Sequence, residues 1–152
     1  MGWFGYSLYD GDDTQSLHID FIKWAIPQVS EDTIFGWLHY RKTKIPAGYF
    51  LQFRKGVPNL LKKIKAPKNK LNWNEDKAIE WQMLLALFVD NNLIVPHKVL
   101  VYGMLACYYL LGEHSADFRE PSKRRAVIRR FMKKVDSLFC SVKARREISK
   151  YI

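Results

Sequence analysis

The sequence has few cysteines and no long hydrophobic run. Only Cys107 and Cys140 occur among 152 residues, which excludes a disulfide scaffold, and neither lies at metal-ligand spacing from a histidine or a second cysteine. We expect both to be buried, reduced thiols, and we expect no cofactor. The longest apolar run, from Val99 to Leu111, is shorter than the roughly 20 residues of a membrane span, and the N-terminus has no secretory signal pattern. The sequence therefore predicts a cytoplasmic protein with no membrane partner.

Glycine and proline are also scarce, with eight and six residues spread along the chain, which excludes collagen-like and linker-dominated architectures. We find no helix-turn-helix, RNP motif, zinc-finger spacing, Walker loop or Gly-x-Ser-x-Gly motif. What the chain does contain is apolar: 48% of the residues are hydrophobic and 14% are aromatic, which excludes a disordered chain. The length favours one domain, residues 1–152.

Apolar residues recur mainly at the 3.6-residue spacing of helices, which predicts an all-α fold. A first helix is expected to begin at Asp12 or Asp13 and to end before Pro27. A second helix is expected to begin at Ser30 and to end before Pro46.

The next region, 47–65, contains Gly56 and Pro58, and we expect it to be kinked or split into two short helices. Asn72 or Asn74 is expected to cap the helix that follows.

The segment near 96–112 is apolar on nearly all sides, which is typical of a buried helix, and Asn91-Asn92 predicts the turn before it. A long last helix is predicted from Pro121. Its apolar stripe comprises Val127, Phe131, Val135, Leu138 and Val142. The prediction is an irregular bundle of five to seven helices around a buried central helix near 96–112.

The net charge of +10 is concentrated in two segments. Residues 41–71 hold ten bases and no acid, and residues 122–152 carry a net charge of +9, whereas residues 1–40 and 72–121 carry −5 and −4. Two basic segments on an otherwise acidic chain predict basic faces that attract a polyanion, with the first forty residues facing away from it. The sequence leaves open whether the two segments share one face.

Within the first basic segment, rings such as Tyr49 and Phe53 alternate with bases; such rings can stack on nucleic-acid bases or belong to the core. In the last helix, Arg125, Arg129 and Lys133 recur every four residues and could contact phosphates along a duplex, although any solvated basic face has this pattern. The candidate polyanion-binding residues are Arg41, Lys42, Arg54, Lys55, Lys62, Lys63, Arg124, Arg125, Arg129, Arg130 and Lys133.

The segment from Trp3 to Asp13 combines glycines, rings and aspartates, and predicts an ordered loop that leads into a helix. It resembles the opening of a family of small uncharacterised bacterial proteins, Trp-Gly-x-Gly-x-Phe-Asp-Asn-Asp-x-Ala, in which the matching positions are Trp3, Tyr9, Asp10 and Asp13. The departures from that pattern are Phe4, Ser7 and Gly11. A weaker similarity covers residues 75–81. Because the family has no assigned reaction, the resemblance implies a kinship of fold and no function.

An alternative hypothesis is a small metal-dependent enzyme that uses Asp10, Asp12, Asp13, His18 and Asp20. These residues lack EF-hand spacing, and on one helix His18 and Asp20 point to different faces. Helix capping by the aspartates explains the cluster equally well.

A second possible acid/base group would bring Glu80 together with His114 and Asp117, although a loop whose acids pair with nearby bases has the same composition. Taken together, the sequence favours a non-catalytic protein that binds nucleic acid, a nucleoprotein complex or an acidic protein surface, as a phage or mobile-element inhibitor would. The remaining alternative is a protein-directed interaction or immunity module. The sequence leaves the oligomeric state open.

Overall fold

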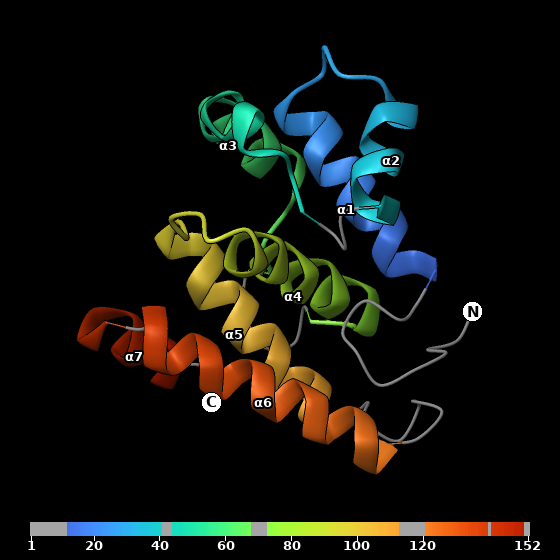
Figure 1. Cartoon of the computed structure of the whole chain (residues 1–152). Coiled ribbons are helices and arrows are strands. Elements are labelled where there is room, and N and C mark those ends of the chain that lie inside the picture. The colour runs from blue at the N-terminus through green and yellow to red at the C-terminus, as the bar shows by residue number, and fades with distance from the viewer. Residues whose placement is uncertain (1–11, 41–43, 68–72, 113–120, 140, 151–152) are drawn as a thin grey trace.

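Figure 1 shows the computed structural model, which describes residues 12–40, 44–67, 73–112, 121–139 and 141–150. Within these ranges the chain forms seven α-helices, one short 3-10 helix and no strand, which confirms the predicted all-α class. The elements are α1 (Asp12–Ala25), α2 (Glu31–Tyr40), η1 (Ala47–Tyr49), α3 (Phe50–Lys63), α4 (Glu75–Asp90), α5 (His97–Leu111), α6 (Pro121–Phe139) and α7 (Val142–Ser149). The predicted N-terminal loop lies outside the described residues.

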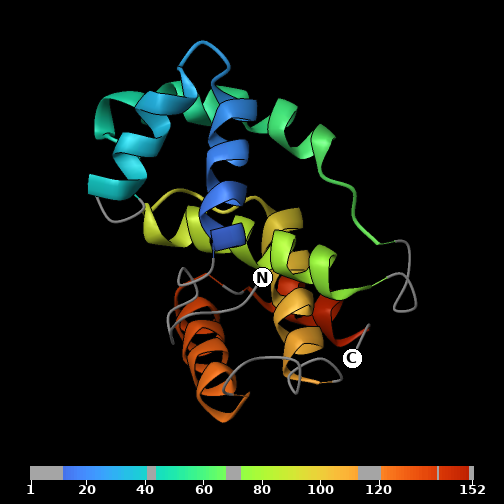
Figure 2. The same ribbon diagram turned by 90° about the vertical axis from the view of Figure 1, so that its right-hand side faces the viewer.

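Two helices, α4 and α5, share the centre of the bundle. They pack against each other, α1 packs on α4 and also contacts α2 and α3, and α6 and α7 pack on α5 (Figures 1 and 2). The predicted buried helix near 96–112 is present as α5, but α4 is buried to the same degree, with all nine residues from 81 to 89 inaccessible to solvent. Because α4 lies between α1 and α5, more than one of its faces is covered.

The region 47–65 is not split, as the sequence suggested it might be. After the short η1, a single helix α3 continues through Gly56 and Pro58. Pro58 lies on the exposed side, where water can bind the carbonyl that lacks a helical donor. Gly56 is the point at which α3 meets α1: a Cβ at this position would overlap the carbonyl group of Ala25. The glycine therefore permits a close helix crossing.

Side-chain caps begin two of the helices where the sequence predicted them. The Thr33 amide donates to Ser30 Oγ over 3.2 Å, and the Lys77 amide donates to Asn74 Oδ1 over 2.8 Å. The predicted turn at Asn91-Asn92 also forms. Within the described parts of the chain, no helix has the length and apolar character needed to cross a membrane.

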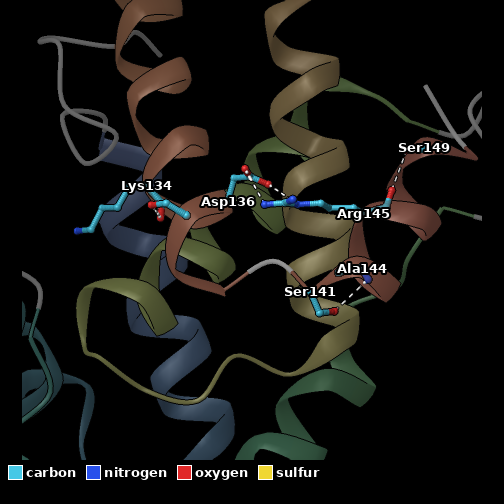
Figure 3. A network of polar contacts seen from close by, with 7 residues as sticks. Lys134, Asp136, Ser141, Ala144, Arg145 and Ser149 are labelled. Carbon is cyan, nitrogen blue, oxygen red and sulfur yellow. Dashed lines mark hydrogen bonds and ion pairs between the residues drawn. The ribbon is translucent and has the colours of Figure 1, made fainter.

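The long last helix predicted through Val142 is instead two helices. The helix α6 ends at Phe139, and α7 begins at Val142 with a new cap, in which the Ala144 amide donates to Ser141 Oγ over 3.2 Å (Figure 3). The helix therefore breaks between the last two residues of the predicted apolar stripe. As a result, Leu138 and Val142 are exposed rather than buried.

Candidate nucleic-acid interface

The helix α6 presents a basic surface opposite its apolar one. Its inward side is formed by Ile128, Phe131, Met132 and Val135, which pack into the core. On the outward side, three predicted residues are exposed, and Arg125 at the edge is half-buried. The exposed three are Arg129, Arg130 and Lys133. We call these three residues together with Arg125 the α6 basic face. None of the four forms an ion pair with a residue that the structure describes.

Arg124 does not belong to this face, although the sequence suggested that it flanked the row. It lies four residues before Ile128, on the inward side of the helix, and only 2% of its surface is exposed. Its charge acts on Cys107 of α5, where it opposes the effect of burial on the thiol pKa. Arg124 is therefore a residue of the interior and is not available to a phosphate at the surface.

Basic side chains contact the acids near the junction of α6 and α7. Arg145 reaches from α7 to α6 and donates to both carboxylate oxygens of Asp136 over 3.2 Å (Figure 3). Lys134 Nζ lies 3.9 Å from Asp90 Oδ1, and His97 Nε2 lies 2.8 Å from Glu147 Oε2. Further bases at this junction are exposed, and the sequence pattern did not indicate them as site residues. They are Lys143, Arg146 and Lys150. Ser141 was the feature of the sequence that could have indicated them. Serine is a preferred capping residue, so it marks the start of a new helix, and these bases belong to that helix or follow it.

The other candidates in the first basic segment lie on α3. Arg54, Lys55, Lys62 and Lys63 are all exposed, whereas Arg41 and Lys42 lie outside the described residues. The rings beside them pack against other rings of the fold. Phe53 is fully buried with its ring 5.6 Å from that of Phe88, and Tyr49 packs on Trp37 at 4.6 Å. These rings belong to the packing of the fold, which was one of the two interpretations left open.

The helices α3 and α6, which carry the described candidate bases of the two segments, do not come together. In both views α3 and α6 lie at opposite ends of the bundle, with α4 and α5 between them (Figures 1 and 2). On α3 the exposed bases fall into two pairs separated by about two helical turns, whereas the three exposed bases of the α6 basic face lie within about one turn. The α6 basic face is therefore the denser of the two cationic surfaces.

His18, a candidate metal ligand, is a core residue. It is fully buried, and its Nε2 lies 3.0 Å from the carbonyl oxygen of Met83, so this nitrogen carries a proton and donates. Asp20 is exposed on the other side of α1, as the two-residue spacing predicted. Among the described residues, no three histidine, cysteine or acidic side chains gather closely enough to hold a metal ion. The side chains of Asp10, Asp12 and Asp13 lie outside the description.

Burial lowers the pKa of His18 from 6.5 to about 4, against a smaller opposing effect of the bond to Met83. The unfolded chain therefore takes up this proton first, and stability falls as the pH drops from about 6.5 towards 4. We expect wild-type protein to lose about 2 kcal/mol of unfolding free energy between about pH 8 and about pH 5 through this residue.

Urea unfolding of wild type and His18→Gln at the two pH values measures this contribution. The variant keeps an amide donor at position 18 but has no titrating group at that position. We therefore expect its unfolding free energy to fall by about 2 kcal/mol less than that of wild type between the two pH values. The comparison cancels the opposite trend of Asp20, Glu80 and Asp90, whose pKa values are raised mainly by desolvation. Equal losses in the two proteins would show that His18 does not titrate as a buried group.

A pocket of about 290 Å³ opens between α1 and α4. Three carboxylates, Asp20, Asp76 and Glu80, line it together with Ser16, Leu17 and Ile79. Burial raises the pKa of Glu80, and the nearby Lys77 partly opposes this shift. The possible acid/base partners His114 and Asp117 lie outside the described residues. The pocket is acidic, so it adds nothing to a site for a polyanion.

Cys107 is buried, as predicted, and Cys140 lies outside the described residues. Burial raises the pKa of the Cys107 thiol to about 12, with smaller opposing effects from a hydrogen bond and from Arg124. The hydrogen bond is donated by Gln82 Nε2 to the sulfur over 3.6 Å. A thiol in this environment stays protonated and is a weak nucleophile.

The chain matches no protein-family model, and comparisons with curated proteins and with solved structures give no match either. The resemblance of the opening segment to the Trp-Gly family therefore stays a prediction.

Proposed function

We propose that this is a non-catalytic binding protein whose α6 basic face engages the phosphate groups of a nucleic acid, free or within a nucleoprotein complex. One observation carries the proposal: Arg125, Arg129, Arg130 and Lys133 form a compact cationic surface without acidic partners among the described residues. Such a surface attracts polyanions and gains affinity by releasing their counterions. The protein would act in the cytoplasm.

The repulsion within this face supports the proposal. Arg125 and Arg129, and Arg129 and Lys133, lie four residues apart, and Arg130 lies three residues before Lys133. Like charges at such spacings destabilise a helix by about 0.2–0.5 kcal/mol per pair. The helix tolerates this because its inward side is well packed. A bound polyanion would remove the repulsion and raise the stability of the protein.

The length of the face suits a nucleic-acid backbone. Arg125 and Lys133 are separated by about 12 Å along the helix axis. DNA carries one phosphate about every 3.4 Å along each strand, so several phosphates lie within this distance. The proposal requires contacts to the backbone and leaves sequence preference aside, because phosphate contacts position a protein without reading bases.

Fluorescence anisotropy with labelled duplex DNA, single-stranded DNA and RNA tests the proposal. We expect binding to at least one of them at about 50 mM salt, with affinity falling steeply as salt is added. Absence of binding to all three at that salt would end the proposal. A pull-down from the native host with and without nuclease then separates partners bridged by nucleic acid from an acidic protein bound directly.

A further inference from the structure

Among the described residues, the three most exposed large hydrophobic side chains lie in or beside two turns, one between α4 and α5 and one between α6 and α7. Ile94, in the turn between α4 and α5, is 76% exposed, and Leu138 and Val142, at the end of α6 and the start of α7, are 63% and 67% exposed. We call these three residues the apolar tip. An isolated exposed aliphatic residue is ordinary, but a group of them marks an interaction surface.

An ion pair and a hydrogen bond link the helices on either side of the two turns of the tip. Lys134, one helical turn before Leu138, lies 3.9 Å from Asp90 at the end of α4. On the far side of both turns, Glu147 of α7 lies 2.8 Å from His97 at the start of α5. The turn that carries Ile94 is therefore fixed at both of its ends to the helices that carry Leu138 and Val142, and Figure 1 shows the two turns at the same end of the bundle.

The surroundings of the apolar tip are positively charged. Its described acids, Asp90, Asp136 and Glu147, each have a basic partner, which leaves an excess of bases. The exposed bases beyond those partners are Lys133, Lys143, Arg146 and Lys150. The occupant of this surface should therefore combine negative charge with an apolar layer.

We propose that the apolar tip and its bases bind the surface of an anionic membrane, with the three side chains in the apolar boundary below the headgroups. Aliphatic side chains rimmed by lysine and arginine suit this boundary, and each base near an anionic leaflet adds attraction. Three aliphatic side chains supply only a minor part of the roughly 800 Å² that each partner buries in a stable protein interface. The expectation of no membrane partner rested on the length of apolar runs, which does not bear on contact by side chains at a surface.

Vesicle flotation tests this proposal with phosphatidylcholine alone and with phosphatidylcholine that contains phosphatidylserine. Wild-type protein is expected to float with the anionic vesicles and not with the neutral ones. The combined variant Ile94→Ser, Leu138→Ser, Val142→Ser is expected to bind the anionic vesicles at least about tenfold more weakly, because it keeps every charge and loses the apolar contact. The single variant Leu51→Ser, which removes a leucine that is 60% exposed on α3, is the matched control and should float like wild type.

Two flotation results would overturn the proposal: wild type that stays unbound with anionic vesicles, or a triple variant that floats as well as wild type. The membrane proposal does not depend on the function proposed for α6. Measuring the nucleic-acid affinity of the triple variant separates the two proposals. The triple variant should bind nucleic acid as wild type does. If it loses that affinity too, the apolar tip belongs to the nucleic-acid surface and the membrane proposal is wrong.

Discussion

Replacing Gly56 by alanine is expected to lower the free energy of unfolding by about 3 kcal/mol or more. A Cβ at Gly56 would overlap the carbonyl oxygen and carbon of Ala25, and it would also lie too close to the Cα of Ala25. All three are backbone or Cα atoms, so no side-chain rotation can relieve the overlap. The helices α1 and α3 would have to move apart, which would loosen core contacts such as those of Phe53 and Phe21.

Thermal unfolding followed by circular dichroism measures this effect, and a fall in Tm of roughly 6–12 °C is expected for a domain of this size. The matched control is Gly36→Ala in α2, where a Cβ would meet nothing within 4 Å. Alanine is the better helix former by about 1 kcal/mol, so this variant should be at least as stable as wild type. A Gly56→Ala protein with wild-type stability would contradict the close crossing of α1 and α3.

Neutralising the α6 basic face is expected to weaken nucleic-acid binding by about 100-fold or more at about 50 mM salt. The variant is Arg129→Gln, Arg130→Gln, Lys133→Gln, which removes the three exposed cations and keeps residues that favour a helix. Since the three side chains are exposed, the melting temperature should stay close to that of wild type. Anisotropy titrations against the tightest-binding probe measure the loss.

The matched control neutralises the same number of charges on α3, in the variant Lys55→Gln, Lys62→Gln, Lys63→Gln. These residues are equally exposed but lie at the other end of the bundle from α6. The control is expected to lose far less affinity, through the change in overall charge alone. Equal losses in the two variants would mean that net charge, rather than a defined face, drives binding.

Local chemistry allowed the helix starts to be predicted. Ser30 and Asn74 cap helices because their side-chain oxygens accept from amides that have no helical partner, and this preference depends on neighbouring residues alone. The turn at Asn91 was predictable for the same reason. Its side chain also accepts from the amide of Ile45 over 2.7 Å, a contact between distant segments that no local pattern indicates.

Tertiary contacts decide the two places where the helices differ from an expectation: the split that was one alternative for 47–65, and the unbroken last helix. Gly56 has a low helix propensity, but in α3 it is required by the approach of Ala25. At the other end of the chain, Leu138 and Val142 continue the spacing of a buried stripe. The break at Ser141 turns α7 back onto α5, where Ala144 and Ile148 are buried instead. Spacing alone does not indicate whether a helix continues or restarts.

The candidate site was predictable as a charged segment but not as a surface. Arg124 and Arg125 are neighbours in sequence, yet one is buried and the other lies at the edge of the exposed face. Successive residues differ by about 100° around the helix axis. Spacing alone does not assign a residue to a helix face precisely enough to distinguish these two neighbours. The separation of α3 from α6 depends on the order in which helices pack, which the sequence did not reveal.

The central claim is that the α6 basic face contacts phosphates directly, and the salt dependence of binding tests it most directly. The slope of log Kobs against log salt concentration counts the phosphates that a protein neutralises, at about 0.9 for each on duplex DNA. We predict that the variant Arg129→Gln, Arg130→Gln, Lys133→Gln has a slope shallower than that of wild type by about 2.7, while the α3 control keeps the wild-type slope. An unchanged slope in the α6 variant would contradict the claim, whatever its affinity.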